Sequence, residues 1–125
     1  MLLARNIMIE NVITQKRDTT IQGCIELLFK THVGSIVIVD DEQRCTGLFT
    51  ERDVIRVVAQ KIPLDAPIEK VMTKNIFTVD EDATFEEVKT VLKTHGIRHL
   101  PVVNSAIKLV GLISVRQILD QFLGL

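Results

Sequence analysis

The stretch from Gly47 to Val54, Gly-Leu-Phe-Thr-Glu-Arg-Asp-Val, places a hydroxyl and a carboxylate where a predicted strand passes into a predicted helix. Residues 45–50 favour a strand, and apolar residues recur at helical spacing over residues 52–59. Thr50 is therefore the last strand residue or the helix N-cap, and its oxygen and the first backbone N–H groups of the helix face the same volume. A helix N-terminus attracts anions such as phosphate, and Asp53 can accept hydrogen bonds from a vicinal diol such as that of a ribose.

The same residues also have a purely structural interpretation. A threonine N-cap followed by an acidic residue in the first turn is an ordinary way for a helix to satisfy its own end and its dipole. The octapeptide alone leaves both interpretations open. The ligand-binding interpretation gains weight because the chain contains this stretch twice.

Composition indicates one globular domain of 125 residues, with 46% hydrophobic and 25% charged residues. Fifteen basic and sixteen acidic residues give a net charge of −1, and neither sign gathers into a long run. We therefore expect no nucleic-acid partner and no binding to an anionic membrane surface. The N-terminus has no apolar core of signal length, and no apolar run approaches the ~20 residues of a membrane span, so we expect a soluble, cytoplasmic protein.

The sequence shows no arrangement typical of an enzyme or a metal site. Cys24 and Cys45 lack CxxC spacing and a clustered histidine, and we interpret both as buried small apolar residues. His32 and His95 lie near predicted helix ends, where donor groups meet the last carbonyls. Asp53 has no second carboxylate for acid–base chemistry, so we expect no catalytic residue, no metal and no required cofactor.

The chain is a tandem repeat with an offset of 64 residues, which holds without a gap through both halves. Identical pairs at this offset include Met8 and Met72, Asn11 and Asn75, Thr14 and Thr78, Asp18 and Asp82, Thr20 and Thr84, Leu28 and Leu92, Val39 and Val103, Gly47 and Gly111, Leu48 and Leu112, and Arg52 and Arg116. We therefore divide the domain into a first unit, residues 1–61, and a second unit, residues 62–125. At this period neither unit is expected to close its core without the other.

Each unit is predicted to have the element order βαββα, which makes the fold class α+β. The first unit is expected to contain a strand at 12–14, a helix at 21–31, strands at 35–39 and 45–50, and a helix at 51–60. The second is expected to contain a strand at 76–78, a helix at 85–95, strands at 98–103 and 108–113, and a helix at 115–123. Thr84 and Glu87 predict a capping box, and Pro67 is expected at the first position of a short helical turn in the linker.

Two further segments have the types and order of a known repeat: Val71 to Ile76, Val-Met-Thr-Lys-Asn-Ile, and His99 to Val103, His-Leu-Pro-Val-Val. Together with Gly47 to Asp53, they resemble the cystathionine β-synthase (CBS) domain, and the resemblance covers nearly the whole chain as a tandem pair, or Bateman module. It implies a regulatory module rather than an enzyme. Such pairs pack about a pseudo-twofold axis, leave two clefts that commonly bind AMP, ADP, ATP or S-adenosylmethionine, and often join into a disc-like homodimer.

The family's pattern assigns the ribose site to Thr50 and Asp53, with Leu48 against the base or sugar and Arg52 as a further cation. The opposite side of this cleft is expected to enclose the purine and to approach the phosphate. The residues expected there are Thr73, Ile76, Phe77, Ile97, Arg98 and His99.

The second cleft departs from the pattern, because Ser114 keeps the hydroxyl while Gln117 stands where the carboxylate belongs. A glutamine has one carbonyl acceptor and no charge, so its bonds to a diol should be weaker by roughly 1–2 kcal/mol. We expect one good site per chain and a weak or empty second site. The residues of the second site are Ile13, Ser35, Leu112, Ser114, Arg116 and Gln117.

Within this family we expect a sensor that binds AMP or ADP in preference to ATP, because only two or three cations face the phosphate end. An S-adenosylmethionine sensor and a scaffold that needs no ligand are the alternatives. Apolar residues of the two last helices are interpreted mainly as core, whereas Phe122, Leu123 and Leu125 leave a strip that a second copy would bury, which predicts a homodimer. No effector domain accompanies the pair, so we expect output through a separate effector protein or an oligomeric rearrangement.

Overall fold

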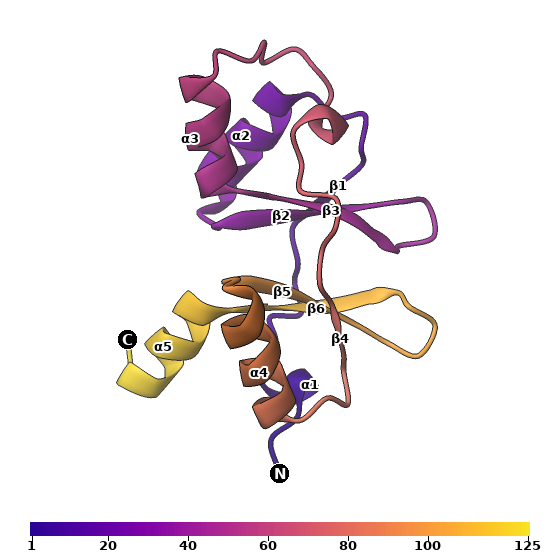
Figure 1. Ribbon diagram of the computed structural model, residues 1–125, viewed down its shortest axis with the longest axis vertical. Coiled ribbons are helices and arrows are strands. Elements are labelled where there is room, and N and C mark those ends of the chain that lie inside the picture. The colour runs from indigo at the N-terminus through magenta and orange to yellow at the C-terminus, as the bar shows by residue number, and fades with distance from the viewer. The chain divides into compact units, whose positions relative to one another are not determined.

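The computed structural model describes residues 1–125 and divides into two compact units (Figure 1). One unit is the continuous segment Ile13–Ile76, and the other joins Met1–Val12 to Phe77–Leu125. The first twelve residues therefore belong to the unit that contains the second half of the chain. The boundary between residues 61 and 62 describes the repeat along the sequence, and as a domain division it stays a prediction.

The continuous unit holds a three-stranded sheet in the order β1-β2-β3, with β1 parallel to β2 and β2 antiparallel to β3. Its helices α2 and α3 lie on one face of this sheet (Figure 1). Its elements are β1 (Thr14–Gln15), α2 (Ile21–Thr31), β2 (Ser35–Val39), β3 (Cys45–Thr50), α3 (Glu51–Ala59) and the short 3-10 helix η1 (Ile68–Lys70).

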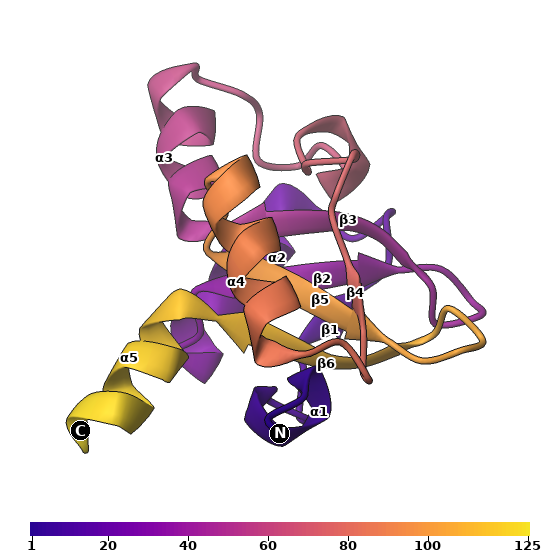
Figure 2. The ribbon, with the colours of Figure 1, turned by 60° about the horizontal axis from the view of Figure 1, so that its bottom comes forward.

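The second unit repeats this arrangement with a sheet in the order β4-β5-β6. Its elements are α1 (Ala4–Ile7), β4 (Val79–Asp80), α4 (Phe85–His95), β5 (His99–Val103), β6 (Leu109–Ser114) and α5 (Val115–Leu123). Helix α1 contacts β6, although the two are far apart in the sequence, and Figure 2 shows α1 in indigo beside that strand. The registers of the two sheets agree, because Gln15 pairs with Ile38 and Val79 pairs with Val102, each 64 residues further on.

Each unit has an apolar core of its own, built from equivalent positions. All five residues of β2 are buried, and Ile21, Cys24 and Leu28 meet them from one stripe of α2, at the spacing of a helix face. The core of the continuous unit consists of Ile21, Cys24, Leu28, Ile36, Ile38, Phe49, Val57, Ile68 and Val71. The other core consists of Ala4, Ile7, Val79, Val88, Leu100, Val102 and Ile113.

The predicted order βαββα is confirmed, and the bounds of α2, β2, β3, α4 and α5 agree with those expected. The strands predicted at 12–14 and 76–78 begin later, at Thr14 and Val79, because only there does the chain come into register with β2 and β5. Helix α1 was not predicted, whereas η1 is the short helical turn expected in the linker. Pro67 is the N-cap of η1 and not its first helical residue.

The helix ends differ in part from those expected. Thr84 Oγ1 accepts from the Glu87 N–H at 3.1 Å, but no bond returns from the Glu87 side chain, so this capping box is half formed. His32 is itself the C-cap of α2, in the left-handed region at φ 57°, where the other repeat has Gly96. Its backbone therefore ends the helix, a place that favours glycine.

The cysteines are both free, and Cys24 is fully buried as expected, whereas Cys45 is only partly buried. Burial raises the pKa of both thiols to about 11, so both stay protonated at neutral pH. No helix of the structure has the length and apolar character needed to cross a membrane.

The hairpin between β2 and β3 is organised by the carboxylate of Asp40. Its Oδ1 accepts from the N–H groups of Glu42 and Arg44, both at 2.9 Å, and its Oδ2 accepts from Arg44 Nε at 2.9 Å. The backbone bond from Arg44 is the main cause that lowers the pKa of Asp40. The other repeat has Asn104 at this position, whose Oδ1 accepts from Ala106 and Lys108 in the same way.

We expect Asp40→Asn to remove a pH dependence while keeping the turn. A lowered folded-state pKa means that the ionised carboxylate stabilises the fold above the unfolded-state pKa of about 4 and that this stabilisation is lost as pH falls through the folded value. Urea unfolding between about pH 6 and pH 2 should therefore show the wild type losing stability relative to Asp40→Asn at the acid end. Asn104→Asp is the reciprocal control, and parallel curves for wild type and Asp40→Asn would contradict the expectation.

Candidate functional site

The segment that precedes Thr73 packs onto the outer edge of β3. The Leu48 N–H donates to the Thr73 carbonyl at 3.0 Å, and the Thr73 N–H donates to the Leu48 carbonyl at 2.9 Å. A Cβ placed on Gly47 would overlap the Met72 side chain, at 2.8 Å from its Cγ. The glycine is therefore needed for close approach, and two residues predicted separately for the site, Leu48 and Thr73, lie side by side.

The other repeat has the same construction. Ile9 and Leu112 exchange two backbone hydrogen bonds, of 2.8 and 2.9 Å. A Cβ on Gly111 would lie 2.6 Å from Met8 Cγ. The repeated methionine and the repeated glycine are thus the two sides of one contact.

Thr50 and Asp53 form a complete capping box at the start of α3. Asp53 Oδ2 accepts from the Thr50 N–H at 2.9 Å and lies 3.3 Å from Thr50 Oγ1, while the Asp53 N–H donates to Thr50 Oγ1 at 3.4 Å. The structure therefore shows the helix-capping role that the sequence allowed for Thr50 and Asp53. One oxygen of the carboxylate is committed to the cap, and the side chain is only 14% exposed.

The backbone amides at this helix start are less open than expected. The Glu51 N–H donates to the Gly34 carbonyl at 3.1 Å, and the Asp53 N–H is used by the cap. The expectation that these first amides face a ligand is wrong for Glu51 and Asp53, because the loop between α2 and β2 satisfies the first and the N-cap satisfies the second. The Arg52 side chain is exposed on the first turn of α3.

Arg56 belongs to this site and was missed in the sequence analysis. Its Nη2 donates to the Val71 carbonyl at 2.6 Å and lies 3.4 Å from Asp53 Oδ1. It thereby ties α3 to the segment that carries Thr73. Its spacing of three residues from Asp53 was a signal for the ion pair, but no pattern in the sequence marks a backbone carbonyl as the partner.

The remaining residues predicted for the first site divide between the units. Ile76 ends the continuous unit, whereas Phe77, Ile97, Arg98 and His99 belong to the other. Phe77 stacks on His95 with ring centroids 3.7 Å apart, so His95 has a partner beyond the helix end. Ile97 packs against its own core, Arg98 is exposed, and His99 begins β5 opposite Ser114. A joint site from both units stays a prediction.

The residues predicted for the weaker site divide in the same way. Ile13 and Ser35 lie in the continuous unit, and Ser35 is buried, whereas Leu112, Ser114, Arg116 and Gln117 lie in the other. Ser114 Oγ accepts from the Gln117 N–H at 3.3 Å, which keeps the N-cap. The Gln117 side chain does not complete a capping box but donates through Nε2 to the Ile7 carbonyl at 3.1 Å.

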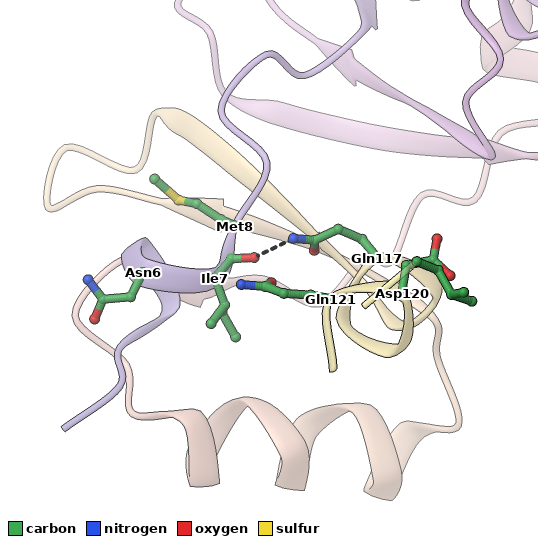
Figure 3. Close-up of a pocket in the computed structure, with 7 residues that line it drawn as sticks. Asn6, Ile7, Met8, Gln117, Asp120 and Gln121 are labelled. Carbon is green, nitrogen blue, oxygen red and sulfur yellow. Dashed lines mark hydrogen bonds between the residues drawn. The ribbon is translucent and has the colours of Figure 1, made fainter. Parts of the chain in front are cut away.

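Gln117 and Arg56 therefore serve equivalent carbonyls, since Ile7 and Val71 are 64 residues apart. Beside Gln117 lies a pocket of about 480 Å³ between α1 and α5 (Figure 3). It is lined by Asn6, Ile7, Met8, Gln117, Asp120, Gln121 and Leu125. No group of three or more His, Cys, Asp or Glu side chains converges as a metal site would require.

The model of the CBS domain family matches this chain twice, over residues 4–60 and 68–124. The chain belongs to the CBS domain family. Its CBS pair is 33% identical over 103 residues to a 17.7 kDa protein of Acidianus ambivalens, with 82% of this chain and 62% of that protein covered. It is 37% identical over 110 residues to protein MJ1225 of Methanocaldococcus jannaschii, with 88% and 39% covered. The chain thus spans less than two thirds of either relative.

A solved structure has nearly the same fold as this CBS pair. It is the CBS domain pair of protein MJ0100, in complex with 5′-methylthioadenosine and S-adenosyl-L-methionine. The TM-score is 0.88 at 27% identity, and the match covers 98% of this chain and 97% of that chain. The family resemblance and the α+β class of tandem CBS repeats are confirmed.

We expect Gly47→Ala to destabilise the protein by about 1–3 kcal/mol, because the added methyl group overlaps Met72 in a closely packed place. Met72→Ala should relieve the overlap, so the double variant should lose less stability than the sum of the two single variants. Urea unfolding of the four proteins measures this coupling.

Gly96→Ala is the matched control for that cycle. It places a methyl group in open space, at a positive φ of 60°, so it should lower stability without coupling to Met72→Ala. Additive losses for Gly47→Ala and Met72→Ala would show that the contact between them does not explain the glycine.

Proposed function

We propose that this CBS pair is a regulatory module that binds an adenosine-containing ligand at the corner made by Thr50 and Asp53. The observation that carries the proposal is the state of the Asp53 carboxylate. Oδ2 is held by the cap, while Oδ1 has only the 3.4 Å contact with Arg56 and keeps the capacity to accept from a ribose diol. The bound ligand would share this carboxylate with the cap, not displace the cap.

Contacts of the nearby arginines support a ligand with few phosphates. Arg56 is engaged by the Val71 carbonyl and by Asp53, which leaves Arg52 as the exposed cation on this part of α3. One cation suits a monophosphate better than a triphosphate, so AMP is the first ligand that we propose. S-adenosylmethionine is the second, because a CBS pair with 27% identity to this chain holds that ligand.

We expect Asp53→Asn to weaken binding of the preferred ligand at least about tenfold, or about 1.4 kcal/mol. The asparagine oxygen can still accept from the Thr50 N–H, so the variant tests the charge and the second acceptor without removing the cap. Calorimetric titrations of AMP, ATP, S-adenosylmethionine and 5′-methylthioadenosine into wild type and variant provide the measurement.

Thr84→Ala is the control for a general loss of stability, because it removes the N-cap of α4. It should lower the unfolding midpoint and leave the dissociation constant unchanged. Equal affinity of wild type and Asp53→Asn for the preferred ligand would overturn the proposed site at Asp53. Silence with all four ligands would favour a scaffold that needs none.

We also propose that a second copy of the chain covers the outer faces of α3 and α5. The interpretation of these apolar residues as mainly core is wrong for Ile55, Val58 and Leu119, whereas Phe122 was expected on the exposed strip. All four are 54–71% exposed. Ile55 corresponds to Leu119 and Val58 to Phe122, so each unit presents the same apolar face. Like faces on both units suit the self-complementary contact of a homodimer. Ligand binding would then regulate either by rearranging this dimer or through a separate effector protein.

Val58→Glu should convert a dimer of the wild type into a monomer, because it places a charge in the middle of an apolar contact. Sedimentation equilibrium at matched concentrations measures the mass. Phe29→Glu is the control, since Phe29 is an apolar residue of α2 that is 81% exposed outside these faces. A wild-type monomer, or a dimer that persists with Val58→Glu, would contradict the proposal.

A further inference from the structure

The pocket between α1 and α5 is rich in hydrogen-bond acceptors. Gln117 donates its Nε2 to the Ile7 carbonyl, and its Oε1 is buried without a hydrogen-bond partner. The Asp120 carboxylate lines the same pocket and makes no hydrogen bond or ion pair. In Figure 3, Asn6, Ile7 and Met8 stand on one side, Gln117 and Gln121 extend toward them from α5, and Asp120 lies further along the same helix.

No cation of the chain balances these groups, because no Lys, Arg or His lines the pocket. A buried amide oxygen without a partner destabilises the fold when no donor reaches it. A carboxylate beside it adds a negative charge. The pocket thus lacks a positively charged group with several donors.

The other repeat shows which group satisfies the equivalent place. The positions equivalent to Ile7, Gln117 and Asp120 are Val71, Asp53 and Arg56. There the Arg56 guanidinium donates to the Val71 carbonyl at 2.6 Å and contacts Asp53 Oδ1 at 3.4 Å. The chain's own guanidinium therefore bridges the carbonyl and the side-chain acceptor, and the first repeat has a cation where the second has an anion.

We infer that the pocket at Gln117 and Asp120 binds a small molecule with a guanidinium group. The guanidinium would donate to Gln117 Oε1 and to the Asp120 carboxylate. A planar fork of donors suits two acceptors on different side chains better than a single ammonium does. The volume of about 480 Å³ is in the range of small-molecule sites and leaves room for an aliphatic chain beyond the guanidinium.

This site is separate from the adenosine site proposed at Asp53. Gln117 was predicted to be a weaker ribose contact, but its amide is already bound to the Ile7 carbonyl, and its remaining acceptor favours a donor ligand. The inference does not depend on whether the chain binds a nucleotide.

The test uses agmatine, with N-carbamoylputrescine as the analogue in which an uncharged urea replaces the guanidinium, and putrescine as a diamine without the guanidinium. Titration into ¹⁵N-labelled protein should shift the Gln117 side-chain amide resonance and the backbone amides of residues 6–8 and 117–125. Agmatine should bind at least tenfold more tightly than either analogue. Equal responses to all three compounds would overturn the inference, because they would show no recognition of the guanidinium.

Three variants complete the test. Asp120→Asn keeps the shape of the side chain and should weaken agmatine binding at least tenfold. Asp120→Arg should abolish it, since the new guanidinium can fill the pocket as Arg56 does in the other repeat. Glu26→Gln removes an exposed carboxylate of α2 and should change nothing. Unchanged binding in Asp120→Asn would overturn the inference, because the carboxylate would then not hold the guanidinium. An equal loss in Glu26→Gln would also overturn it, because agmatine would then respond only to surface charge.

Discussion

The contact between a methionine side chain and the bare backbone of a glycine is the constraint on which each repeat depends. Met72 lies on Gly47, and Met8 lies on Gly111, so closely that a single added methyl group would overlap the sulfur-containing side chain. In each unit this contact holds the segment that carries the methionine against the outer edge of the sheet. The paired hydrogen bonds of Leu48 with Thr73 and the position of the Val71 carbonyl follow from it. A change at Gly47 would therefore also disturb the Leu48–Thr73 pair and the Val71 carbonyl, beside the corner proposed for the ligand.

In the proposed site, Asp53 serves the fold and the ligand together. Its carboxylate completes the cap of α3 with one oxygen and faces Arg56 with the other. Capping and recognition use the same property, an acceptor fixed at the start of a helix. The two repeats differ in charge here: the anion Asp53 corresponds to the neutral Gln117, and the cation Arg56 corresponds to the anion Asp120. Equivalent backbone geometry thus carries side chains of different chemistry in the two repeats.

The repeat and its hydrophobic periodicity were sufficient to predict most helices and strands, because those patterns are local. The links that shape the sites were not predictable in this way. Arg56 and Gln117 both bind a backbone carbonyl, which has no signature in the sequence, at separations of 15 and 110 residues. The helical period of α3 and α5 identified their apolar residues but not which face the sheet covers, so Val54 and Ile118 pack on the cores while Ile55 and Leu119 do not. Short elements such as α1 and η1, with four and three residues, are too brief for any period to appear.

The division of the chain into one continuous and one discontinuous unit has a consequence for the order of folding. The bond from Arg56 to Val71 closes a loop of 15 residues, whereas its counterpart from Gln117 to Ile7 spans 110. On chain entropy alone, the longer closure costs roughly 2 kcal/mol more. During synthesis, every residue of the segment Ile13–Ile76 is made before Phe77 is added, while the first twelve residues have no sheet to join until β6 and α5 exist. The continuous unit can therefore become ordered during synthesis before residues 1–12 have the sheet that they pack against.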